Sequence, residues 1–488
     1  MRIGFDNAKY LKMQSDHIRE RIQRFGGKLY LEFGGKLFDD FHASRVLPGF
    51  APDAKMQMLL QLKDQAEIVI AINAEDIESG KVRGDYGITY DADVLRLIGE
   101  FRRAGLMVGS VCLTRWAEQP SAVIFRRRLE EIGVPSFCHY KIPGYPNDVQ
   151  LIVSDEGYGK NEFIETTRPL VVVTAPGPGS GKMATCLSQL YHEHKRGVKA
   201  GYAKFETFPI WNLPLKHPVN LAYEAATADL ADVNMIDPFH LEAYGQTTVN
   251  YNRDVEIFPV LNAMFELIAG ESPYRSPTDM GVNMAGNCIC DDEACCEASR
   301  QEILRRYMKA RCDHKRGAQM DDLRTLELLV RQVGVTEADR PVIAAARKRE
   351  EETGDAAAAI ELPNGQIVTG KTSDLLGPTA AALLTALKEL AGIPHEVKLV
   401  SPEAIAPIQH LKTDFLGGHN PRLHSDEVLI ALSASAAQDP VAAKAMAAIP
   451  QLRNLEAHTT VMLPRPDEDI CRRLGLRLTS DPVYGQKL

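Results

Sequence analysis

The sequence lacks the marks of a membrane or secreted protein. No stretch approaches the roughly 18 consecutive apolar residues that a membrane-spanning helix needs. The N-terminal residues MRIGFDNAKYLKMQ hold no apolar core ahead of a small-residue cleavage site, as a signal peptide would. Cysteine is scarce, with 9 in 488 residues, and a sparse, odd-numbered set does not suit a disulfide scaffold. These absences predict a cytoplasmic protein with no membrane partner.

Positive charge is in deficit as well. Lys and Arg number 56 against 65 Asp and Glu, which gives a formal net charge of -9. Because an acidic chain gains nothing from a phosphate backbone, no nucleic-acid partner is expected. Hydrophobic residues make up 45% and charged residues 25%, which is ordinary globular composition. The length exceeds what one core usually supports and predicts two or three domains.

Strand-like and helix-like segments alternate over the first part of the chain. Short segments at 28–33, 67–73 and 106–113 have the pattern of strands, and the apolar run at 67–73, rich in β-branched residues, is typical of a buried parallel strand. A helical pattern at 91–104 separates two of them, and PLVVVT at 169–174 is the clearest strand. The rhythm predicts an α/β fold: a mostly parallel sheet with helices on both faces, and a P-loop-like strand-loop-helix.

Three regions are expected along the chain. Residues 1–165 form an N-terminal α/β region, and residues 166–346 carry a glycine-rich loop and continue into a helical segment. Residues 356–488 form a smaller C-terminal α/β domain, in which Glu396–Val400 is an expected strand. The charged run Arg347–Asp355 between them is the expected linker.

The glycine-rich loop APGPGSGK, residues 175–182, joins a buried strand to a helix. A phosphate-binding loop needs several backbone N–H groups directed at one anion, and the helix N-terminus adds its positive dipole end. Gly177, Gly179 and Gly181 permit that backbone, and Lys182 reaches the outer phosphates. We therefore expect a phosphate-bearing small molecule as partner, with ATP or another nucleotide and Mg²⁺ as the candidate cofactor.

The loop departs from the Walker A pattern at two positions. Pro176 stands at the first glycine position, and Met183 follows the lysine where Ser or Thr would bind Mg²⁺. Ser180 and Thr185 are the nearest hydroxyls, but neither is at the usual place. The alternative interpretation is a glycine-rich turn needed only for tight packing.

Two further segments extend the candidate site. Asp237 ends the run Ala231–Asp237, which resembles a Walker B strand that binds Mg²⁺ through water. The run is short and contains polar residues, so a loop fits it at least as well. Lys204 and Glu206 lie at the end of the next predicted strand, 199–205, and ligands collect at the carboxyl ends of strands; the alternative is a surface ion pair. The candidate catalytic residues are Lys182 and Asp237, and the candidate ligand-binding residues are Gly177, Gly179, Ser180, Gly181, Lys182, Thr185 and Lys204.

A second segment, Gly365–Thr372, fits every letter of the Walker A pattern. Its spacer contains Ile, Val and Thr, which prefer an extended strand, and Gly365 belongs to an Asn-Gly turn. A strand cannot curl around a phosphate, so we expect a chance match or a strand end here; the alternative is that the Lys371–Ser373 end caps the next helix or contacts an anion.

Four cysteines cluster in CICDDEACC, as Cys288, Cys290, Cys295 and Cys296. Two close thiol pairs are compatible with zinc, although the usual separated C-x-x-C pairs are absent. A zinc-dependent protein is therefore a further alternative.

Several segments together resemble one family. YLEFGGKL, SGKMATCLSQLYHE, SPTDMGVNMAGNC and NPRLHSDEVLIALS look like an uncharacterised conserved bacterial protein family of about this length, a domain of unknown function with no assigned activity. The resemblance covers nearly the whole chain. It implies a bacterial cytoplasmic protein whose N-terminal region carries the loop, followed by a separate, smaller C-terminal domain; it implies no reaction and no catalytic residue.

Two main functions follow from these residues. An enzyme would position a nucleotide or phosphorylated metabolite at Pro176–Lys182 and catalyse phosphoryl or group transfer. A non-catalytic, phosphate-ligand-binding or regulatory protein would keep the loop without turnover, which the missing hydroxyl after Lys182 favours. Homo-oligomerisation is expected for a bacterial enzyme of this size.

Overall fold

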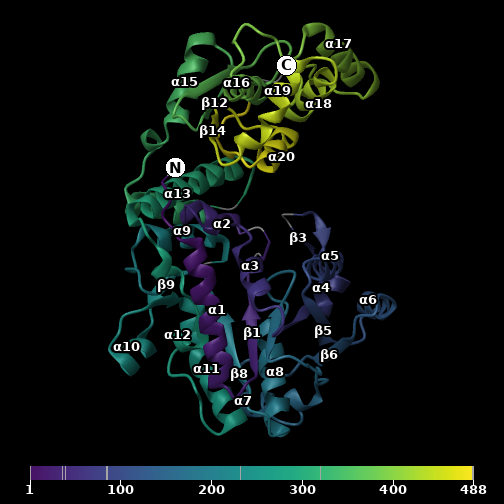
Figure 1. Ribbon diagram of the computed structural model, residues 1–488, viewed down its shortest axis with the longest axis vertical. Helices are drawn as coiled ribbons and strands as arrows, with labels where there is room; N and C mark the ends of the chain where they lie inside the picture. Colours follow the sequence, from purple (N-terminus) through teal and green to yellow (C-terminus); the bar gives the residue numbers. More distant parts are fainter. Residues whose placement is uncertain are drawn as a thin grey trace. The chain divides into compact units, whose positions relative to one another are not determined.

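The structure, a computed structural model, describes residues 2–35, 37–38, 40–83, 86–230, 232–318 and 320–485. The chain divides into two compact units (Figure 1). The larger unit contains residues 2–224 and 231–298, and the smaller contains residues 225–230 and 299–488. Among the described residues, no helix combines the length and apolar character needed to cross a bilayer.

A seven-stranded parallel sheet forms the centre of the larger unit. Its strand order is β11-β8-β1-β7-β2-β5-β6, and every pairing is parallel. The strands are β1 (Leu29–Phe33), β2 (Ala66–Asn73), β5 (Met107–Trp116), β6 (Ser136–Tyr140), β7 (Leu170–Thr174), β8 (Gly201–Phe205) and β11 (Gly281–Val282). The predicted parallel α/β fold is confirmed, and strands from both of the first two expected regions share one sheet.

Helices and two small antiparallel ribbons surround this sheet. The ribbons pair β3 (Val82–Arg83) with β4 (Ile88–Thr89), and β9 (Asn234–Ile236) with β10 (Val249–Tyr251). The helices of this unit are α1 (Asn7–Arg24), α2 (Phe41–Val46), α3 (Ala54–Gln61), α4 (Ala74–Glu78), α5 (Tyr90–Arg103), α6 (Pro120–Glu131), α7 (Val149–Ile152), α8 (Lys182–Lys195), α10 (Pro238–Tyr244), α11 (Asn252–Ala269) and α12 (Pro277–Met280). Helices α9 (Pro218–Ala226) and α13 (Asp292–Lys315) begin in this unit, and their last residues belong to the smaller one.

Alternation along β1 assigns the helices to the two faces of the sheet. Tyr30 and Glu32 point to one face, where the Tyr30 hydroxyl donates a 2.7 Å hydrogen bond to Glu193 of α8. Phe33 points to the other face and stacks on Phe205, over which the ammonium of Lys55 from α3 lies. Both faces are therefore covered, which is why β2 and β7 are buried along their whole lengths.

The smaller unit has a mixed four-stranded sheet in the order β13-β12-β14-β15. An apolar cluster around Leu383, Leu387 and Leu432 joins this sheet to its helices. The elements are α14 (Asp321–Val333), α15 (Pro341–Thr353), β12 (Ala357–Glu361), β13 (Ile367–Lys371), α16 (Pro378–Ala391), α17 (Pro402–His410), α18 (Ser425–Ala436), α19 (Pro440–Ala447), β14 (Glu456–Thr459), α20 (Arg465–Leu474) and β15 (Arg477–Ser480).

Two local predictions in this part of the chain are wrong. The expected linker Arg347–Asp355 is mostly the second half of α15, because Pro341 begins that helix and Gly354 ends it with a left-handed φ of 73°. The expected strand Glu396–Val400 is an irregular segment. Its apolar residues Leu399 and Val400 pack into the core as side chains, and its backbone pairs with no strand.

The second Walker A match is a strand, as predicted. Its spacer lies in β13, and the Lys371 ammonium forms a 2.8 Å ion pair with Asp355. The match depends on Gly370, and packing explains this glycine: a Cβ there would lie 2.1 Å from the backbone nitrogen of Ala382 in α16. The close approach of α16 to β13 is therefore sufficient to explain Gly370, and no bound phosphate is needed to account for it.

We predict that Gly370→Ala lowers the free energy of unfolding of the smaller unit by about 1–3 kcal/mol, because the helix backbone must move away from β13. Urea denaturation measures this change. Gly485→Ala is the matched control, since a Cβ there stays 4.0 Å from the nearest atom and the residue does not have a left-handed φ. Equal stability of the two variants would refute the packing explanation.

Candidate functional site

The glycine-rich loop lies at the carboxyl edge of the central sheet. It follows β7, which lies between β1 and β2, and it leads directly into α8. Ligands of open parallel α/β sheets bind at this edge, and the expected strand-loop-helix context of Lys182 is present.

The loop backbone has the geometry of an anion-binding nest. Gly179 and Gly181 have left-handed φ values of 76° and 87°, and Ser180 between them does not. Alternating handedness of this kind turns successive N–H groups toward one side. In this fully described loop, the N–H groups of Gly177, of residues 179–181 and of the first helical residue Lys182 donate no hydrogen bond to the protein.

The hydroxyls that could bind Mg²⁺ are engaged within the loop itself. The Ser180 hydroxyl donates a 2.9 Å hydrogen bond to the Gly177 carbonyl, and that of Thr185 donates a 3.0 Å bond to the Gly181 carbonyl. Both residues are buried. Their position supports a structural role for these hydroxyls, which stiffen the loop.

Packing accounts for two of the three loop glycines. A Cβ on Gly177 would lie 2.3 Å from the Tyr90 hydroxyl, and one on Gly181 would lie 2.9 Å from Thr114. Thr114 also donates a 2.8 Å hydrogen bond to the Ser180 carbonyl, which ties the loop to β5. Gly179 differs, because nothing lies within 4 Å of its Cβ position. Packing alone therefore leaves Gly179 unexplained.

Lys182 forms no ion pair or hydrogen bond among the described residues. It does act on Cys186, one turn along α8: burial raises the pKa of Cys186, the Glu32 carboxylate adds to this increase, and Lys182 opposes it. The ammonium of Lys182 and the carboxylate of Glu32 are therefore within electrostatic range of the same buried thiol.

Lys204 and Glu206 form a charge cluster at the same edge, and Asp254 from α11 completes it; Glu206 is buried, whereas the Lys204 and Asp254 side chains are half-buried. The Lys204 ammonium contacts the carboxylate of Asp254 and lies 3.1 Å from Oε1 of Glu206. Burial lowers the pKa of Lys204, but Asp254, Glu206 and Glu32 more than offset this effect, so the pKa lies above its ordinary value. The ion pair of the alternative interpretation is therefore present, half-buried and extended by Asp254.

Glu32 is a site residue that the sequence interpretation did not identify. It pairs in register with Val173 of β7 and with Lys204 of β8, so it lies between the loop strand and the charge cluster. Its Oε2 accepts a 2.7 Å hydrogen bond from the Tyr202 hydroxyl. The available signal was a single acidic residue inside the otherwise apolar strand LYLEF.

Glu206 is the most perturbed carboxyl group of the cluster. Burial raises its pKa to about 7, although Lys204 acts in the opposite direction. Its Oε2 is buried and accepts no hydrogen bond in the described structure. A buried carboxyl that titrates near neutrality and has one unsatisfied oxygen is suited to accept or donate a proton.

Asp237 does not join this site. It follows β9, which pairs only with β10 and lies outside the central sheet; Ala231, the first residue of the predicted run, lies outside the described residues. The Asp237 carboxylate is fully buried. It accepts a 3.0 Å bond from the His240 N–H at the start of α10 and a 2.6 Å bond from the Thr278 hydroxyl. These contacts make it a helix cap.

The four clustered cysteines do not form one ligand set. The thiols of Cys288, Cys290 and Cys295 lie near three different backbone carbonyls, those of Met284, Ile3 and Gly4. Only Cys296 belongs to the group of potential metal ligands found among the described residues. A zinc centre made from all four cysteines is therefore contradicted by the geometry.

Comparison with known proteins covers both units. A family model described as domain of unknown function DUF1846, N-terminal, matches residues 3–334, and the corresponding C-terminal model matches residues 338–488. A UPF0371 protein of Streptococcus pneumoniae (strain JJA) is 59% identical over 482 residues, covering 99% of this chain and 98% of its own length. A UPF0371 protein of Streptococcus thermophilus (strain CNRZ 1066) is 60% identical over the same shares. These descriptions name no activity.

We predict that Glu206 makes the larger unit less stable as the pH rises. Its folded pKa of about 7 exceeds the unfolded value of about 4.3, so the folded state binds more protons between these values and loses stability as the pH rises through them. Urea unfolding of wild type and Glu206→Gln from pH 5 to pH 8 tests this.

Glu206→Gln should remove part of that fall in stability, so that the variant gains on the wild type with rising pH. Glu271→Gln, at an exposed position, is the control and should follow the wild-type profile. Parallel profiles for wild type and Glu206→Gln would show that Glu206 ionises normally.

Proposed function

We propose that this chain, which belongs to the DUF1846 family of uncharacterised bacterial proteins, binds a phosphate-bearing small molecule at the loop Pro176–Lys182. The ligand's phosphate would accept hydrogen bonds from the loop backbone at the N-terminus of α8 and would pair with the Lys182 ammonium. The organic part of the ligand would extend along the carboxyl edge toward the charge cluster of Glu32, Lys204, Glu206 and Asp254.

The row of unpaired N–H groups is the observation that carries this proposal. Any helix leaves its first N–H groups without intrahelical partners. Here Gly179 and Gly181 continue the row into the preceding loop. Packing does not require a glycine at position 179, because a Cβ there would meet no atom within 4 Å. This favours a role for Gly179 in shaping the nest.

Magnesium has little support in this arrangement. Met183 occupies the position of the Mg²⁺-binding hydroxyl, and the hydroxyls of Ser180 and Thr185 bond to loop carbonyls. The backbone and Lys182 would therefore supply most of the charge compensation. ATP with Mg²⁺ and a homo-oligomeric state both stay predictions.

Lys182→Ala should weaken the binding of a phosphate ligand by about 10- to 100-fold, since hydrogen bonds to charged groups contribute about 1.5–3 kcal/mol. Thermal stabilisation by inorganic phosphate, pyrophosphate and a nucleotide panel, each with and without Mg²⁺, identifies the ligand. Titration of that ligand into both proteins then measures the change in affinity.

Lys199→Ala is the matched control, because it removes the same charge from an exposed position beyond the end of α8. It should bind the ligand as the wild type does. Equal affinity of Lys182→Ala and the wild type would refute the proposal, as would a wild type that binds none of these phosphates.

Group transfer is a second candidate function, favoured by the buried Glu206 carboxyl with its raised pKa. In this case Glu206 would take or give the proton of the transferred group or its acceptor. Glu206→Gln should then reduce turnover of the identified ligand by at least about 100-fold while changing its affinity little. Steady-state kinetics test this. Unchanged turnover would refute a role for Glu206 in group transfer and leave ligand binding as the one remaining proposal.

A further inference from the structure

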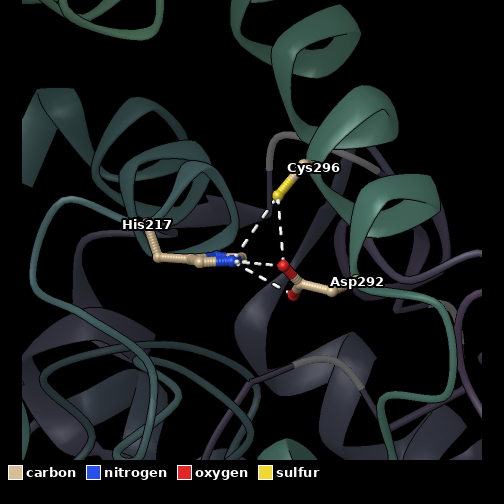
Figure 2. A group of neighbouring side chains, drawn as sticks. All are labelled: His217, Asp292 and Cys296. Atoms are coloured by element: carbon tan, nitrogen blue, oxygen red, sulfur yellow. Dashed lines mark hydrogen bonds and ion pairs between the residues drawn. The ribbon is translucent and has the colours of Figure 1, made fainter.

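Three potential metal ligands converge at the start of α13. His217 lies just before α9, while Asp292 and Cys296 lie in the first and second turns of α13 (Figure 2). Because the two α13 residues are four apart, their side chains lie on one face of that helix. Figure 2 shows the His217 ring pointing at this face, with Nε2 toward the carboxylate and the thiol.

The three ligand atoms have the mutual distances of a tetrahedral metal site. Nε2 of His217 lies 3.4 Å from Oδ2 of Asp292 and 3.5 Å from Sγ of Cys296, and that sulfur lies 3.8 Å from the same Oδ2. Zinc bonds of about 2.0–2.3 Å at tetrahedral angles give edges of about 3.3 Å between nitrogen and oxygen and about 3.5 Å to sulfur. An ion fits with shifts of a few tenths of an ångström.

We propose that His217, Asp292 and Cys296 bind a zinc ion. Imidazole, carboxylate and thiolate together match the mixed preference of this borderline-soft ion, whereas Ca²⁺ and Mg²⁺ require oxygen ligands. Three protein ligands leave one tetrahedral position for water or another ligand, as in catalytic zinc sites.

The three side chains differ in exposure, and the exposed one leaves the fourth coordination position of the proposed zinc open to solvent. Cys296 is buried and the His217 side chain is 10% exposed, whereas the Asp292 side chain is 60% exposed. The protein side of the site is therefore fixed by packing, and its open side lies next to Asp292.

A hydrogen-bonded trio without metal is the competing interpretation. The Val219 N–H donates a 3.3 Å bond to Nδ1 of His217, which leaves the ring proton on Nε2, facing Asp292. Zinc at Nε2 requires the other neutral tautomer, in which the single ring proton lies on Nδ1, so the long bond from Val219 is lost. The two interpretations therefore differ in stoichiometric metal binding.

The test is titration of the full-length protein, stripped with a chelator, with Zn²⁺ and with Co²⁺ as a spectroscopic probe. We expect one equivalent to bind, with the intense visible absorption of tetrahedral Co²⁺ and a sulfur-to-metal charge-transfer band. Cys296→Ser should abolish that band and weaken Zn²⁺ binding by more than the 10- to 100-fold typical of losing an outer-shell partner. His217→Gln should weaken it similarly.

Cys290→Ser is the matched control, since this exposed thiol is close in sequence but lies outside the group. It should retain full stoichiometry and the charge-transfer band. Circular dichroism confirms that each variant is folded. Absence of saturable binding to the wild type would overturn the proposal, and so would equal loss in Cys290→Ser and Cys296→Ser. Neither result depends on phosphate binding at Lys182.

Discussion

The parallel pairing of β7 with β1 is the constraint on which the candidate site depends. It aligns Glu32 with Val173 and, through β8, with Lys204. This register brings the loop after β7 and the charges at the end of β8 to the same edge. A shift of one residue would turn Glu32 and Lys204 to the opposite face, where Phe33 and Phe205 now stack. The position of the charge cluster therefore follows from the strand register.

Burial of charge is the second constraint, and the cluster satisfies it by mutual compensation. Lys204 is surrounded by three carboxylates, which keep it protonated although burial opposes its charge. For Glu206 the compensation is incomplete: the effect of burial outweighs that of the nearby Lys204 ammonium, so its pKa is raised. A buried group that shares a counter-ion with a stronger competitor is poised to change its protonation state.

The two proposed sites show different ways of organising ligand atoms. At the loop after β7, backbone N–H groups are turned to one side by glycines, and little side-chain chemistry is needed. At the start of α13, side chains four residues apart meet a histidine from a distant segment. The first arrangement is encoded locally, whereas the second depends on chain segments about 75 residues apart in sequence, as the contact between His217 and Asp292 shows.

The sequence by itself determined the parallel α/β class, the strand that leads into the glycine loop, and the strand character of the second Walker A match. These features depend on periodicity and turn chemistry within a few residues. It also identified Lys204 and Glu206 at the end of their strand.

Only the tertiary structure decided which distant residues meet. Asp237 resembled a metal-binding carboxylate, yet its strand belongs to a separate ribbon, and Glu32 lies beside the loop strand in its place. Four neighbouring cysteines suggested one centre, yet among the described residues only Cys296 of the four joins a group of potential metal ligands, with His217 and Asp292. Strand order and helix facing are set by long-range packing, which no local pattern encodes.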